Sequence, residues 1–242
     1  MKWILLAKVA MLLNFKVLAA DPETWLTTYY QSPNPEKFVT EVIKLSQQGV
    51  LSDPKRQQSL AVFLGRILIA NPNQTNQWLS ALGTLNKKDT QTLYYTAWLA
   101  DTKESKAYLQ SVNAQSLLNS KAINYLEIDI KSPKTLDNLW SYFFATGQIA
   151  PIRRIVSALN YAEYSGALKA YKTSKQTNED KRKAKIDAIF QAARWSIGSN
   201  IKQHSKVAEI CADILKNTQL TNNEELWLSI VLAKALPNQY KM

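Results

Sequence analysis

The sequence contains one cysteine, one histidine and only six glycines in 242 residues. A lone Cys211 cannot form an intramolecular disulfide, and one cysteine with one histidine cannot supply the ligands of common zinc sites. No phosphate-binding glycine loop, dinucleotide fingerprint or calcium-loop spacing occurs, and few glycines remain to build a cofactor loop. We therefore expect neither a cofactor nor a metal.

Residues 1–20 have the layout of a secretory signal peptide. Lys2 precedes a mainly apolar stretch, and small residues ending at Ala19 offer a cleavage site. Two lysines and an asparagine interrupt the stretch, so an amphipathic helix that stays on the protein is the alternative. The lysines also disfavour a membrane anchor. We expect export to the periplasm or the exterior of a bacterial cell, with 21–242 as a single all-helical domain lacking a transmembrane span.

Proline placement predicts an all-α fold. Proline follows a potential capping residue four times, at Asp21-Pro22, Asn34-Pro35, Asp53-Pro54 and Ser132-Pro133. Proline at the first helical position sacrifices no hydrogen bond, so each pair predicts a helix start with a capping side chain. Thr221 and Glu224 have the spacing of a capping box before the last helix. Residues 126–130 alternate in polarity and are expected to form an extended connector.

Pro35, Pro54 and Pro72 recur about every 18 residues, so helix pairs would span about 37 residues, as in helical solenoids. We predict about a dozen short helices in a solenoid-like or irregular array, with a compact orthogonal bundle as the alternative. Residues 171–180 are nearly free of apolar side chains and are a candidate linker before a C-terminal helical region.

The excess positive charge is confined to one segment. The chain has 30 Lys and Arg against 19 Asp and Glu, a formal net charge of +11. Residues 151–206 contain twelve of these bases and four of the acids, and so carry +8 (12 minus 4), while the rest of 21–242 is neutral. A basic contact surface is predicted there, formed by Arg153, Arg154, Lys181, Arg182, Lys183, Lys185 and Arg194.

Such a surface suits an anionic partner, either an acidic protein or a polyanion or phospholipid of the cell envelope. Nucleic acid is disfavoured, because no groove-reading motif accompanies the charge. The functionally neutral alternative is a surface that only keeps the protein soluble.

His204 is the one side chain whose ordinary pKa lies near neutrality, which makes it the weak candidate for catalysis. A hydrolase-type enzyme would pair His204 with Ser199 or Ser205 and orient it with Asp187 or Asp213. No Gly-x-Ser-x-Gly elbow supports this arrangement. The favoured alternative is a structural histidine that forms hydrogen bonds at a helix interface.

Tryptophans lie among apolar residues at helical spacing, which favours a role in the core over a role in a ligand site. We expect this of Trp78, Trp98, Trp140, Trp195 and Trp227. A carbohydrate or peptide groove lined by aromatic rings is the alternative.

Three stretches carry a resemblance to a known group of proteins. They are 136–147 (LDNLWSYFFATG), 151–155 (PIRRI) and 192–200 (AARWSIGSN), the last followed by Gln203-His204. Together with Trp25-Leu26 and Tyr29-Tyr30, they resemble a group of uncharacterised, exported, all-helical proteins of bacteria. The resemblance implies export and a helical fold, and it brings no activity or catalytic residue.

These features predict an exported, non-enzymatic helical scaffold or macromolecule-binding protein whose contact surface lies in 151–206. The two alternatives are a hydrolase that uses His204 and a peripheral binder of anionic membranes or envelope polyanions.

Overall fold

A computed structural model describes residues 22–173 and 177–239. The predicted all-α class is confirmed, because this part of the chain forms thirteen α-helices and three 3-10 helices without any strand. The helices range from four to 26 residues, and no regular solenoid stacking is evident. The predicted signal peptide, residues 1–20, lies outside the described residues.

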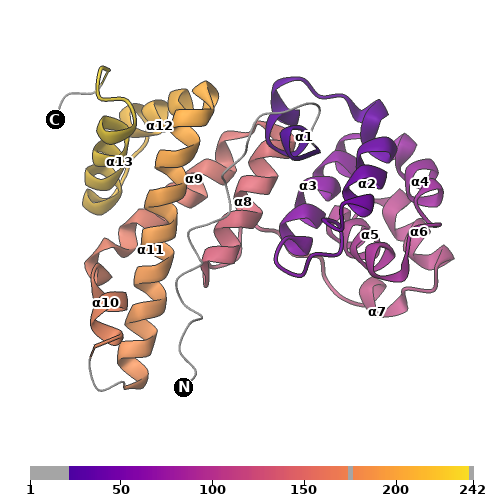
Figure 1. Cartoon of the computed structure of the whole chain (residues 1–242), viewed down its shortest axis with the longest axis horizontal. Helices are drawn as coiled ribbons and strands as arrows, with labels where there is room; N and C mark the ends of the chain where they lie inside the picture. The colour runs from indigo at the N-terminus through magenta and orange to yellow at the C-terminus, as the bar shows by residue number, and fades with distance from the viewer. Residues whose placement is uncertain (1–21, 174–176, 240–242) are drawn as a thin grey trace.

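The first part of the chain forms the group of helices at the right of Figure 1. Within this group α3 packs against α5, and α4 packs against α6. The elements are α1 (Pro22–Thr28), η1 (Tyr29–Gln31), η2 (Pro35–Lys37), α2 (Phe38–Gln47), α3 (Gln57–Ala70), α4 (Pro72–Ala81), α5 (Lys87–Ala100), α6 (Lys103–Ser111) and α7 (Gln115–Leu118).

The second part of the chain forms the middle and left of Figure 1. Helix α8 joins the two parts, because it packs against both α3 and α11. The elements are α8 (Pro133–Thr146), α9 (Ile149–Ser157), η3 (Ala158–Tyr164), α10 (Ala167–Tyr171), α11 (Asn178–Gln203), α12 (Ser205–Asn217) and α13 (Asn222–Ala235).

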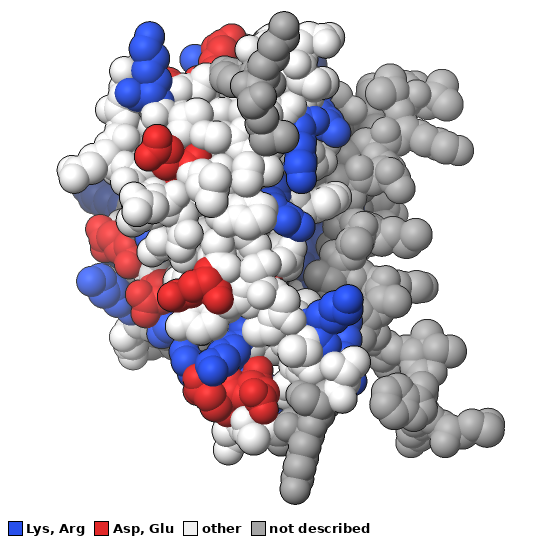
Figure 2. All heavy atoms as spheres, turned by 90° about the vertical axis from the view of Figure 1, so that its left-hand side faces the viewer, with Lys and Arg blue, Asp and Glu red and all other residues white. Residues whose placement is uncertain are grey.

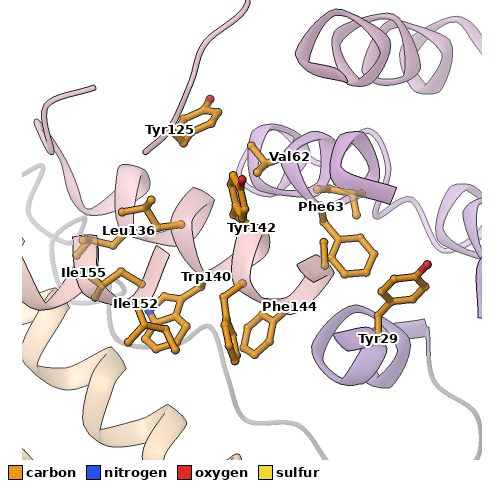
Figure 3. Packing of buried hydrophobic residues seen from close by; sticks show 14 of the residues in the cluster. Tyr29, Val62, Phe63, Tyr125, Leu136, Trp140, Tyr142, Phe144, Ile152 and Ile155 are labelled. Atoms are coloured by element: carbon orange, nitrogen blue, oxygen red, sulfur yellow. The ribbon is translucent and has the colours of Figure 1, made fainter. Parts of the chain in front are cut away.

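One continuous cluster of buried apolar residues runs through both parts, and α8 lies at its centre. Figure 3 shows side chains from η1, α3, α8 and α9 gathered in this cluster. Phe143 of α8 is fully buried and contacts the rings of Tyr30, Trp140 and Phe144, with ring centroids 4.7 to 6.1 Å apart. Such aromatic pairs add to the stabilisation that burial of their area provides.

The proline signals locate several helix starts but misassign their caps. Pro22 and Pro133 are the first residues of α1 and α8 as predicted, and Pro72, which was not among the four predicted starts, begins α4. Asp53-Pro54 instead opens a turn before α3, and Pro35 starts a 3-10 turn before α2.

The predicted side-chain cap is wrong at Ser132, whose hydroxyl caps nothing, and at Asn34. Asn34 accepts a hydrogen bond from the Trp25 indole at 2.9 Å, so a tertiary contact has displaced the local one. The capping box of Thr221 and Glu224 is confirmed. Residues 125–128 form a turn, so the predicted extended connector is wrong over most of its length.

The candidate linker 171–180 runs from the end of α10 into the start of α11, with 174–176 outside the described residues. Thr177 caps α11 through a capping box with Asp180. Helices α10 and α11 pack against each other, so this segment connects two helices in contact. Among the described helices, none is long and apolar enough to cross a lipid bilayer.

Candidate functional site

The two arginines on α9 are used in local packing. Arg153 donates a hydrogen bond to the hydroxyl of Thr218, beyond the end of α12, at 3.2 Å. Arg154 is half-buried and donates to the carbonyl oxygen of Ile128, in the loop before α8, at 2.6 Å. The two guanidinium groups therefore contact different elements.

Two arginines on α11 are also engaged. Arg194 lies over the ring of Trp227 at 5.3 Å and donates to Gln191 at 2.8 Å. It lies about 20 Å along the helix from Lys181. Arg182 binds both carboxylate oxygens of Glu179, at 2.8 and 2.7 Å, and this pairing raises the pKa of its guanidinium.

Three exposed lysines remain at the N-terminal end of α11, and we call Lys181, Lys183 and Lys185 the α11 basic end. Lys183 lies 3.7 Å from Glu179, whereas Lys181 and Lys185 form no ion pair within the described residues. Lys181 and Lys185 are four residues apart and so share one face of the helix. The structure therefore brings together four of the seven predicted cations, these three lysines and Arg182, and leaves Lys181 and Lys185 without an ion pair among the described residues. Figure 2 shows acidic and basic side chains interspersed on the side of the molecule that lies at the left of Figure 1.

His204 lies between α11 and α12 and is only 7% exposed. Its Nδ1 is 3.2 Å from the hydroxyl of Tyr30, and its ring packs against Phe144 with centroids 5.1 Å apart. Burial lowers the pKa of this imidazole, which favours the neutral ring. The histidine thus links α11 to η1 and α8.

The proposed catalytic partners of His204 do not assemble around it in the described structure. The Ser199 hydroxyl accepts a hydrogen bond from Gln203, and Asp213 accepts one from Asn217. Asp187 lies on α11, 17 residues before His204 at the end of that helix, which is about 25 Å along the helix axis. Asp187 instead accepts a hydrogen bond from the backbone amide of Leu168.

Two adjoining hollows on the first part of the chain were not identified from the sequence. The larger, about 430 Å³, lies among α3, α5, α7 and the start of α8, and the smaller is about 220 Å³. Leu117 of α7 lines both, and Tyr95 stacks on Trp98 where they meet, with centroids 5.1 Å apart. We call the two hollows together the α5 groove.

The larger hollow is lined by amide, phenol and apolar groups and one charged side chain, Lys134. Its amides are those of Gln57, Gln58 and Gln91. Gln91, Tyr95 and Trp98 are spaced four and three residues apart, which places them on one face of α5. That spacing was the only signal in the sequence, and it does not show whether the face is exposed.

The tryptophans divide between core and surface. Trp78 and Trp140 are buried as predicted, and Trp98 and Trp227 are half-buried. The prediction is wrong for Trp195, which is 50% exposed because the helices that pack on α11 do not cover it.

The chain matches no protein-family model, no curated protein and no solved structure. The resemblance to exported helical proteins of bacteria therefore stays a prediction. Within the described residues, no three His, Cys, Asp or Glu side chains are grouped as metal ligands.

Proposed function

We propose that this protein is a non-enzymatic helical scaffold that binds an acidic macromolecule through the α11 basic end. The observation that carries this proposal is the exposure of Lys181 and Lys185 on one helix face with no ion pair among the described residues. Opposite charge on a partner would speed association and select the binding face. Salt would weaken such a contact, because exposed charges are screened.

A protein partner is favoured over an anionic membrane. Basic segments that bind acidic lipids usually cluster about four to eight lysines and arginines. The first turns of α11 have four, but Glu179 pairs with two of them, Arg182 and Lys183, and Asp180 also lies in the first turn of this helix. Repulsion between these acids and a lipid surface would oppose binding.

The hydrolase hypothesis has less support. A histidine base must reach the nucleophile that it activates. Tyr30 and Phe144 pack against His204, and neither Ser199 nor Ser205 is hydrogen-bonded to it in the described structure. A structural role in joining helices accounts for these contacts.

We further propose that the protein is exported, on the strength of the signal-peptide layout of residues 1–20. N-terminal sequencing of the native protein tests this. A mature chain that starts near Asp21 is expected, and a chain that retains residues 1–20 would contradict export by cleavage.

The binding proposal is tested by a double charge reversal, Lys181→Glu with Lys185→Glu. The control is Lys216→Glu with Lys234→Glu, which reverses two exposed lysines outside both the α11 basic end and the α5 groove and changes the net charge equally. Partners captured by the wild-type protein from cell-envelope extract would be identified by mass spectrometry, and each variant would be assayed against them. We expect the Lys181→Glu, Lys185→Glu variant to lose binding to these partners and the control to retain it. Equal capture by wild type and the first variant would contradict the proposal.

A further inference from the structure

We propose that the α5 groove binds an extended peptide segment that carries acidic side chains. This site lies apart from the α11 basic end, on α3, α5, α6, α7 and α8, and does not depend on the function proposed for that end.

The dimensions of the groove suit an extended chain. The lining runs along α5 from Gln91 in the larger hollow to Asp101 just after the helix in the smaller one. Ten residues of α-helix span about 15 Å. An extended polypeptide covers about 3.3–3.6 Å per residue, so about four or five residues would fill the groove. Pro54 and Leu117 give the larger hollow an apolar wall for side chains.

The glutamines on α3 present acceptors to such a chain. Gln57 donates through Nε2 to the Thr92 hydroxyl at 2.8 Å, and that hydroxyl donates in turn to the carbonyl of Leu51. Because the Thr92 hydroxyl donates its hydrogen to Leu51, its oxygen can only accept from Gln57. The Gln57 amide must therefore turn its nitrogen toward Thr92, which fixes its orientation. Gln58 donates through Nε2 to Tyr125 at 2.7 Å. Both amide oxygens lack a hydrogen bond to any described residue and can accept from peptide N–H groups.

The charge of the groove favours acidic side chains on the ligand. Lys134 and Lys121 line the two hollows and form no ion pair among the described residues. Asp101 is the one lining carboxylate, and Lys106 already pairs with it at 2.8 Å. Asp137 interacts electrostatically with Lys134 but does not line the groove.

A glycan fits this lining less well than a peptide does. Sugar hydroxyls both donate and accept hydrogen bonds, so the glutamine amides suit either ligand. A neutral sugar leaves Lys121 and Lys134 without a counter-charge, whereas acidic side chains of a peptide can pair with both lysines. The single carboxylate of the lining, Asp101, is already paired with Lys106.

Selection from a phage-displayed library of random short peptides on immobilised full-length protein tests the proposal. Selected peptides would be synthesised with a fluorescent label, and their affinities measured by fluorescence anisotropy. We expect enrichment of Asp and Glu. We also expect at least a tenfold weaker affinity for the Lys121→Glu, Lys134→Glu variant and a smaller loss for Gln91→Ala. The matched control, Lys216→Glu with Lys234→Glu, reverses two exposed lysines outside both proposed surfaces and should bind like wild type.

Both lysine pairs and Gln91 are exposed, so folding of each variant is expected and would be checked by circular dichroism. Hydrogen exchange with bound peptide should show protection in 87–100 and 115–124. The proposal is overturned if no peptide is selected. It is also overturned if selected peptides bind the groove variant as tightly as wild type, if protection falls elsewhere, or if a glycan array yields binders where the peptide library does not.

Discussion

Asp187 should hold α10 against α11, and its removal should destabilise the protein measurably. Its side chain is buried, at 2% exposure. Oδ2 accepts from the backbone amide of Leu168 at 2.9 Å, and Oδ1 accepts from Gln191 Nε2 at 2.9 Å. The Leu168 amide lies in the first turn of α10, where amides lack a partner within the helix. Asp187 therefore provides the Leu168 amide with a hydrogen-bond acceptor that α10 itself does not contain.

The expected magnitude follows from these two bonds. A hydrogen bond to a charged group contributes about 1.5–3 kcal/mol net. The half-buried Gln191 can turn to water in compensation, but the Leu168 amide is held in place by its helix. We expect Asp187→Ala to lower the free energy of unfolding by about 3 kcal/mol. Asp187→Asn retains one good acceptor and should cost about half as much.

Urea unfolding followed by circular dichroism measures these changes, and hydrogen exchange should show faster exchange in α10. Asp213→Ala is the matched control, because exposed Asp213 accepts from Asn217, also four residues later, at 2.6 Å. Asp213→Ala should lower the free energy of unfolding by less than about 0.5 kcal/mol. If Asp187→Ala and Asp213→Ala were equally stable, the role given to Asp187 would be refuted.

Three further predictions concern single side chains. Burial lowers the pKa of His204 below its usual 6.5, so the unfolded chain binds a proton at higher pH than the folded one. Stability should therefore be full above about pH 6.5 and fall as pH drops below it, and urea midpoints of His204→Gln should lack this part of the dependence. Burial raises the pKa of the Cys211 thiol to about 12, so thiol reagents such as DTNB should react with it only in urea. Trp195→Gln should change the free energy of unfolding by less than about 0.5 kcal/mol, whereas Phe143→Ala should lower it by about 3–5 kcal/mol, as thermal or urea unfolding would show.

Local sequence determined the class of the fold and many helix ends. Proline fixes its own backbone and lacks an amide, so its effect at Pro72 and Pro133 does not depend on distant contacts. The bonds of a capping box join residues three apart, so Thr221 and Glu224 could be paired from their spacing alone. Helical spacing among apolar residues likewise placed Trp78 and Trp140 in the core.

Only the tertiary structure decided which side chains remain free for a partner. The surface predicted in 151–206 has seven cations, but contacts with Thr218, Ile128, Glu179 and Trp227 engage five of them. Those contacts come from elements up to 65 residues away, and periodicity carries no information about them. The α5 groove could not be predicted from the sequence for the same reason. Its lining comes from five helices, and a spacing on α5 cannot show that α3 and α7 leave a hollow beside it.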